Sequence, residues 1–245
     1  MTLATRSHEA TPILSLPDRP GGPVIGVLAV QGDFAEHLRM LARVGATGVE
    51  VRTPEDLERV DALIIPGGES TAIGKLLARY GLDVAIVARA SVPSPDPGGA
   101  TGQGEPPRPP LAIWGTCAGM ILMARDIGDS GSKVVAQPLL GLMDLSVRRN
   151  AFGNQLDSFE TDLDAPVVSP RQPVHAVFIR APLIERAGEG VEILARLPDG
   201  RPVAARQGHL LATAFHPELT NDLSFHRYFV ERVAAATSFA ELPVR

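Results

Sequence analysis

The sequence predicts an α/β protein, a single three-layer domain with a mixed, mostly parallel sheet flanked by helices. Short aliphatic runs alternate with amphipathic segments of helical period through the first half of the 245-residue chain, the pattern of βαβ units. The strand-like runs are almost uninterrupted in hydrophobic residues, as expected of parallel strands covered on both faces. We expect residues 23–240 to form this domain and residues 1–22 to form a flexible N-terminal tail.

The first half of the domain alternates strands with helices. The expected order is a strand at 24–30, a helix at 33–45, a strand at 48–52, a helix at 53–60, a strand ending at 65 and a helix at 71–81. Thr53 and Pro54 fit the N-cap and first position of the second helix. Gly45 supplies the C-terminal stop of the first helix, and a Pro-Gly-Gly turn at 66–68 breaks the third strand.

Residues 91–110 are rich in proline and glycine and cannot join a helix or a central strand. The two interpretations are an exposed insertion and a linker between domains. The next segment, LAIWG (111–115), resembles one more core strand of the same sheet, which favours an insertion in a single domain. A helix over 117–128 is expected to follow that strand.

Shorter strand-like runs fill the second half. They lie at 142–149, 175–182, 191–197, 202–207 and 209–215. Several are joined by turn-like Asp-Gly or Gln-Gly pairs, which predicts that antiparallel strands complete the fold. A final amphipathic helix over 221–236 is expected to close the domain, with Asn221 as its N-cap.

Cys117, the only cysteine, stands between glycines in WGTCAGM (114–120). A strand that runs into Gly-Thr-Cys-Ala-Gly and then a helix is the cysteine version of the G-x-S-x-G nucleophile elbow. This turn would present the sulfur at the carboxyl edge of the sheet and at a helix N-terminus, which favours the thiolate. The alternative is a buried cysteine that acts as a small hydrophobic residue.

His216 is the best candidate among six histidines for a base beside this thiol. It ends an apolar strand in LLATAFHPELT (210–220), and Pro217 keeps it out of the α conformation. In an extended segment Glu218 would lie on the same side and hold the imidazole in position. A solvated polar strand end is the alternative.

The PGGES loop (66–70) can approach a substrate closely because its glycines carry no side chains. We expect the backbone N–H groups of Gly68 and Ala118 to form an oxyanion hole. A phosphate loop is a weaker alternative, because neither glycine-rich phosphate motif is present, and a plain turn stays open. One cysteine and no pair of closely spaced histidines argue against a metal site, and no cofactor is expected.

Composition excludes several classes of protein. The chain carries 23 basic and 28 acidic residues, a net charge of −5, with no basic cluster interleaved with aromatic residues. Nucleic acid is therefore not an expected partner. No apolar stretch has the length of a membrane span, residues 1–22 lack the apolar core of a secretory signal, and a single cysteine forms no internal disulfide. We expect a cytoplasmic globular protein.

Taken together, GTCAG and a distant HPE resemble the class I, triad-type glutamine amidotransferases. AVQGDFAEHLRML, LIIPGGEST, CAGMILMA, RRNAFGNQLDSFE, FIRAP and FHPELTNDLSFHRYFV look more specifically like the glutaminase subunit of pyridoxal 5′-phosphate synthase. The resemblance spans residues 24–235 and implies a flavodoxin-like, class I glutamine amidotransferase-like fold. The insertion and the tail depart from it without touching a motif.

The resemblance also implies roles for residues. Cys117 would be the nucleophile, His216 the base and Glu218 its orienting carboxylate. The substrate L-glutamine would be held by residues of three segments, namely Gly68, Glu69, Ser70, Arg149, Ile179 and Arg180. An arginine can pair with the α-carboxylate of glutamine and a glutamate with its α-ammonium.

The implied reaction is hydrolysis of L-glutamine to glutamate and ammonia through a thioester on Cys117. The ammonia would pass to a separate synthase subunit in a large hetero-oligomer that makes pyridoxal 5′-phosphate, since no part of this chain is left to form a second active site. Two alternatives stay open. One is a class I glutaminase that serves another synthase, and the other is a non-catalytic or chaperone-like protein on the related fold.

Overall fold

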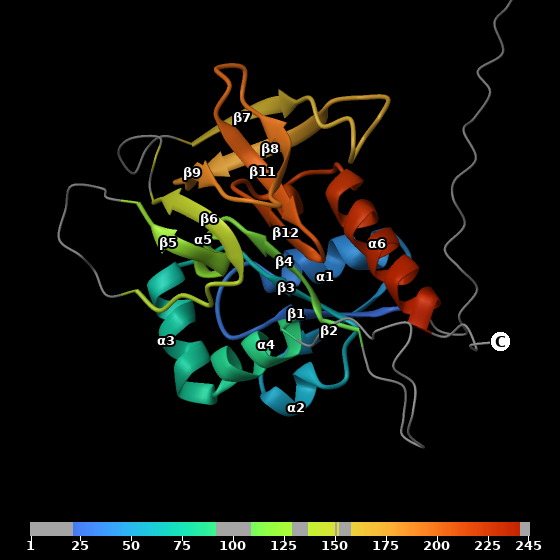
Figure 1. The fold of residues 1–245 in the computed structure, drawn as a ribbon. Helices are drawn as coiled ribbons and strands as arrows, with labels where there is room; N and C mark the ends of the chain where they lie inside the picture. Colours follow the sequence, from blue (N-terminus) through green and yellow to red (C-terminus); the bar gives the residue numbers. More distant parts are fainter. Residues whose placement is uncertain (1–21, 92–108, 129–136, 150, 152–157, 241–245) are drawn as a thin grey trace, which may run out of the picture.

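A central sheet of seven strands organises the chain (Figure 1). The computed structural model describes residues 22–91, 109–128, 137–149, 151 and 158–240. The expected tail at 1–22 and the insertion at 91–110 therefore lie outside the described residues, apart from their ends. Most of the motif RNAFGNQLDSFE (149–160) also lies outside them.

The strand order in this sheet is β10-β11-β12-β4-β3-β1-β2. Its strands are β1 (Val24–Leu28), β2 (Thr47–Val51), β3 (Ala62–Ile65), β4 (Ala112–Thr116), β10 (Glu192–Arg196), β11 (Pro202–Gln207) and β12 (Leu210–Thr213). Neighbours from β2 through β12 run parallel, whereas β11 and β10 add two antiparallel hairpins at one edge. The expected mixed, mostly parallel sheet is confirmed.

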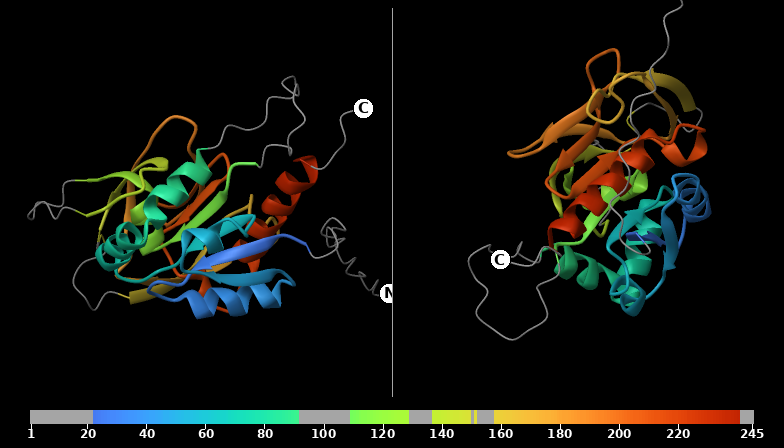
Figure 2. Two further views of the ribbon diagram at one scale, coloured as in Figure 1. Left: turned by 90° about the horizontal axis from the view of Figure 1, so that it is seen from below. Right: turned by 90° about the vertical axis from the view of Figure 1, so that its right-hand side faces the viewer.

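Helices cover both faces of the sheet (Figures 1 and 2). The helices α1 (Phe34–Arg43) and α6 (Ser224–Ala240) contact each other on one face. The other face carries α2 (Pro54–Leu57), α3 (Ser70–Tyr80), α4 (Leu82–Ala90) and α5 (Ala118–Met123). Right-handed crossovers explain why α1 and α2 lie on opposite faces. The connection through α1 leads from β1 to its neighbour β2, and the connection through α2 leads back across β1 to β3, in the opposite direction along the sheet.

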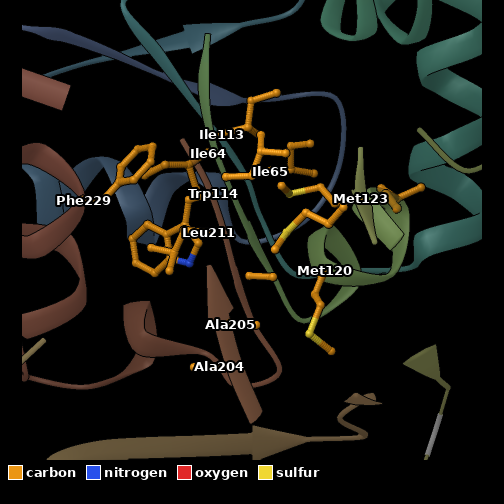
Figure 3. Packing of buried hydrophobic residues seen from close by; sticks show 14 of the residues in the cluster. Ile64, Ile65, Ile113, Trp114, Met120, Met123, Ala204, Ala205, Leu211 and Phe229 are labelled. Atoms are coloured by element: carbon orange, nitrogen blue, oxygen red, sulfur yellow. The ribbon is translucent and has the colours of Figure 1, made fainter. Parts of the chain in front are cut away.

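The buried core is built from both faces of the central strands. Figure 3 shows Trp114 of β4 against Phe229 of α6, with Met120 and Met123 of α5 on the other side of the sheet. Trp114 is fully buried, and its indole N–H donates to Thr213 Oγ1 over 3.2 Å. This hydrogen bond satisfies the one polar atom of the largest core side chain and joins β4 to β12.

Two smaller sheets complete the fold beside the central one. One contains β5 (Ala124–Ile127), β6 (Met143–Arg148) and β9 (Leu183–Ala187), and the other contains β7 (Ser158–Leu163) and β8 (Val174–Ile179). The expected helix over 117–128 is wrong in its second half. The chain turns extended at Ala124, with ψ of 151°, and β5 pairs in parallel with β6. Pairing between distant segments overrides the local helical pattern there.

Of the two N-cap residues expected from the sequence, one is confirmed and the other is wrong. Thr53 caps α2 as expected, since its hydroxyl accepts from the backbone N–H of Asp56 while the Asp56 side chain accepts from that of Thr53. Asn221 does not cap the last helix, which begins at Ser224. Asp222 Oδ1 instead accepts from the Ser224 backbone N–H over 2.8 Å. A further helix, α4, follows Gly81 directly and was not expected from the sequence.

Candidate active site

Three neighbouring parallel strands bring the chemically important loops together. Ile65 of β3 pairs with Gly115 of β4, and Thr116 of β4 pairs with Thr213 of β12. The PGGES loop, Cys117 and His216 each follow one of these strands. Their loops therefore meet at the carboxyl edge of the sheet, where open α/β sheets bind ligands.

A cavity of about 420 Å³ lies at this edge. All the candidate site residues except Glu218 line it, which are Gly68, Glu69, Ser70, Cys117, Ala118, Arg149, Ile179, Arg180 and His216. Glu218 lies behind His216 and is only 5% exposed. Residues from five separate segments of the sequence thus share one pocket.

The Cys117 backbone has φ of 46° and ψ of −101°, a conformation that L-residues rarely adopt. Its N–H donates to Thr213 O over 2.8 Å, which ties the turn to β12. The sulfur lies 4.0 Å from the carbonyl oxygen of Ile179, and the residue is 7% exposed. This is the sharp strand-to-helix turn expected of a nucleophile elbow.

Arg180 is the only other non-glycine among the described residues with positive φ, at 45°. It follows β8 directly and lines the same cavity as Cys117. Backbone strain of this kind costs about 1 to 3 kcal/mol and concentrates at functional sites. Both strained residues of the described chain therefore lie at one site.

His216 and Glu218 form a short buried pair. The Nδ1 atom of His216 lies 2.7 Å from Glu218 Oε1, and the His216 backbone N–H donates to Val177 O over 2.8 Å. The expected pairing is present, but the expected reason was wrong. Glu218 lies in a 3₁₀ turn, η1 (Pro217–Leu219), not in an extended segment, and this turn brings the carboxylate back under the imidazole.

The surroundings of His216 favour its protonated form. Burial lowers the pKa, but hydrogen bonds and charge interactions with Cys117 and Glu218 outweigh it and raise the pKa of His216 to about 10. Burial also raises the pKa of Glu218, against the opposing effect of His216. At neutral pH the imidazolium is the favoured form of His216, the state reached once a thiol proton has moved to it.

Glu69 and Arg149 place two opposite charges in the lining of the same cavity. The Glu69 carboxylate accepts from the backbone N–H groups of Thr71 and Ala72 at the start of α3. Arg149 Nη2 lies 3.6 Å from Glu69 Oε1. Partial burial works against the charge of Glu69, but these N–H groups and Arg149 outweigh it and lower its pKa. The Ser70 hydroxyl lies 3.2 Å from Gln137 Oε1.

The loop after β1 contributes residues that the sequence analysis missed. Asp33 lines the cavity, with Oδ2 at 3.6 Å from His216 Nδ1, and Gln31 Oε1 accepts from the Glu69 backbone N–H over 3.0 Å. Gly32 touches the glycine-rich loop so closely that a Cβ there would lie 1.9 Å from Gly67 O. The available signal was their position, directly after a core strand at the same sheet edge.

Asp33 also forms a possible cation site with His216 and Glu218, since one ligand atom from each lies within 4.8 Å of the others. This group was not foreseen from the sequence. The His216 nitrogen on this side already shares a hydrogen bond with Glu218. A metal would have to break that pair to bind there.

Comparison with known proteins gives a consistent result. The model of the SNO glutamine amidotransferase family matches residues 27–102 and 105–235. A curated protein of Herpetosiphon aurantiacus, "Pyridoxal 5′-phosphate synthase subunit PdxT", is 56% identical over 84% of this chain and 98% of its own. The protein of the same name from Pelotomaculum thermopropionicum is 54% identical, over 86% and 96% of the two chains.

Solved structures agree. A crystal structure described as a glutamine amidotransferase is 46% identical, with a TM-score of 0.72 over 86% of this chain and 98% of its own. A glutamine amidotransferase from Thermotoga maritima shares only 11% identity, with a TM-score of 0.51 over 91% and 85% of the two chains, and supports the fold alone. Among the described residues, no helix combines the length and the hydropathy that crossing a bilayer requires.

Proposed function

This chain belongs to the SNO glutamine amidotransferase family, and we therefore propose that it is the glutaminase subunit of a pyridoxal 5′-phosphate synthase. It would hydrolyse L-glutamine to L-glutamate and ammonia. The observation that supports this most strongly is the convergence of Cys117, His216 and Glu218 at a cavity that also holds Arg149 and Glu69.

The acyl-transfer step would use the buried pair beside the thiol. The Cys117 sulfur attacks the side-chain carbonyl carbon of glutamine after its proton has passed to His216. The backbone N–H groups of Gly68 and Ala118 are proposed to stabilise the oxyanion that develops. His216 then protonates the departing ammonia and, in the second step, takes a proton from the water that hydrolyses the thioester.

Glutamine would be oriented by its charged end. Arg149 is proposed to pair with the α-carboxylate and Glu69 with the α-ammonium group, since both side chains line the cavity and lie next to each other. Because the two side chains already lie 3.6 Å apart, both charges are present before the substrate enters. Ser70, Ile179 and Arg180 are assigned to the same binding site, since all three line it.

The ammonia requires a protected route, because ammonia released into neutral water becomes ammonium and loses its nucleophilicity. We infer delivery to a separate synthase subunit within a large hetero-oligomer. The names of the two relatives support this partner over a synthase of another pathway. A cytoplasmic location belongs to the same proposal and is based on the sequence, whose single cysteine forms no internal disulfide.

The test is ammonia release from L-glutamine by the purified chain, alone and with the cognate synthase subunit. Release that rises with the synthase and is lost in Cys117→Ala is the expected result. The control for folding is that Cys117→Ala still binds the synthase, as detected by size-exclusion chromatography. Wild-type release that persists in Cys117→Ala would contradict the nucleophile, and release unaffected by the synthase would contradict the partner.

A further inference from the structure

Glu218 is contacted by a second buried imidazole, that of His37 in α1. While Oε1 of Glu218 pairs with His216, its other oxygen, Oε2, lies 3.3 Å from His37 Nε2. The side chains of His37 and Glu218 are both fully buried. Oε2 has no hydrogen-bond partner among the described residues, so its contact with His37 Nε2 is one of proximity and charge.

His37 is itself held from two sides. Its Nδ1 lies 2.9 Å from Nε2 of His226 in α6, and its Nε2 lies 3.2 Å from Oγ1 of Thr116, the residue before Cys117. The Nε2–H of His37 would donate to Thr116 Oγ1, while Nε2 also lies 3.3 Å from Glu218 Oε2, which accepts no hydrogen bond from the described residues. The interaction with Glu218 is then mainly that of a fixed dipole with a charge.

Both histidines are neutral. Burial, together with the neighbouring His226 and His216, lowers the pKa of His37 well below its usual value. Burial and the charge of Arg43 lower the pKa of His226 to about 3. Each ring therefore carries a single N–H, and the contact between them contains one proton.

Two placements of that proton are chemically distinct. If His37 donates from Nδ1, its Nε2 lone pair faces the Glu218 carboxylate. The N–H of His226 then lies on Nδ1, which is buried without a hydrogen-bond partner among the described residues. Both features cost free energy. If His226 donates from Nε2, His37 presents its N–H to Thr116 and Glu218, and only one lone pair is left unpaired. The second placement is favoured.

We propose that His37 is a positioning residue for this site: its Nε2–H, set by donation from His226, steadies Oε2 of Glu218 and thereby the imidazole of His216. This role is based on the proposed function, because it acts on the carboxylate assigned to orient the base. It also links α1 and α6, on one face of the sheet, to the turn that contains Cys117.

Two substitutions of His37 distinguish a role in positioning Glu218 from a role in core packing alone. A glutamine amide can place its N–H near the Nε2 position and still face Glu218, whereas an asparagine amide reaches only the Nδ1 position and faces His226. In the complex with the synthase, we expect His37→Asn to lower kcat about 10- to 100-fold with KM for glutamine within about twofold. His37→Gln should stay within about fivefold of the wild-type kcat.

A second measurement needs neither glutamine nor the synthase. Because Cys117 is the only cysteine, its alkylation by iodoacetamide can be followed as a single mass increment. At pH 6.5, His37→Asn should react about fivefold more slowly than the wild type, and His37→Gln at nearly the wild-type rate, because the imidazolium beside the sulfur depends on a well-placed Glu218. If the complex releases no ammonia, the proposed function fails, but this ratio still tests His37.

The tautomer is tested directly by imidazole ¹⁵N NMR of the intact chain, with the His37 signals assigned from their absence in His37→Gln. A protonated Nε2 and an unprotonated Nδ1 between pH 6 and 8 are expected. A protonated Nδ1 would overturn the proposal. Equal kcat values and equal alkylation rates in His37→Asn and His37→Gln would also overturn it. The same holds if the decreases in kcat and alkylation rate only parallel a decrease in thermal stability.

Discussion

Gly67 packs directly against the imidazole of His216. A methyl group at Gly67 would lie 2.3 Å from Cε1 and 2.8 Å from Nδ1 of that ring, and Gly67 is itself buried. The carbonyl oxygen of Gly67 accepts from the backbone N–H of Asp33 over 3.2 Å, so the loop is fixed from the other side. The imidazole has its place only because residue 67 has no side chain.

Gly67→Ala is therefore expected to displace the His216 ring and to lower kcat about 100-fold, the cost of a misplacement of about 1 Å at a reacting group. Ammonia release by the complex with the synthase measures it. The matched control is Gly200→Ala, which strains a positive-φ turn with open space around it, away from the cavity, and should leave kcat unchanged. Wild-type kcat in Gly67→Ala would contradict the assigned position of His216.

Arg149→Ala should weaken glutamine binding more than it slows the chemistry. Loss of a charge-assisted pair with the α-carboxylate predicts a KM about 10- to 150-fold higher, with a smaller change in kcat. The neighbouring Arg148 provides the control, because its guanidinium lies 3.4 Å from Glu185 Oε1 and it does not line the cavity. Equal KM values for Arg148→Ala and Arg149→Ala would argue against the assigned role of Arg149.

The stability of the fold should depend on pH through His216. Its pKa is raised from 6.5 to about 10, so the protonated imidazole stabilises the folded state fully below pH 6.5. This contribution is lost as the pH rises towards 10. We expect the free energy of unfolding to fall over this range by an amount on the order of a few kcal/mol. In His216→Gln the fall should be clearly smaller, as measured by urea unfolding at several pH values. The same fall in both proteins would show that other groups cause it.

Trp114→Phe should destabilise the fold by about 1 to 3 kcal/mol, because it removes core volume and leaves the Thr213 hydroxyl without its indole donor. Circular dichroism during thermal unfolding measures the loss. Tyr80→Phe is a suitable control, since the Tyr80 side chain is 49% exposed. An unchanged unfolding temperature in Trp114→Phe would contradict the packing of α6 against β4.

Local sequence patterns were sufficient to predict the central sheet and most of the helices that cover it. Uninterrupted aliphatic runs identified the parallel strands, and Thr53 with Pro54 identified the start of α2. The same reasoning failed at Ala124, where the residue order suits a helix but pairing with β6 makes a strand. It also failed at Asn221, because the helix begins only at Ser224, where Asp222 Oδ1 accepts from the first backbone N–H, and that start depends on where the preceding turn ends.

Sequence alone determined which residue types could perform the chemistry: a single cysteine in a glycine-rich elbow, a histidine before proline, and a nearby carboxylate. The spatial relationships were decided by the tertiary structure. The 3₁₀ turn pairs Glu218 with His216, and the packing of α1 and α6 brings His37 and His226 behind that pair. The reason is physical: local patterns report backbone preference and burial, whereas contacts between residues far apart in the chain exist only once strands and helices have packed.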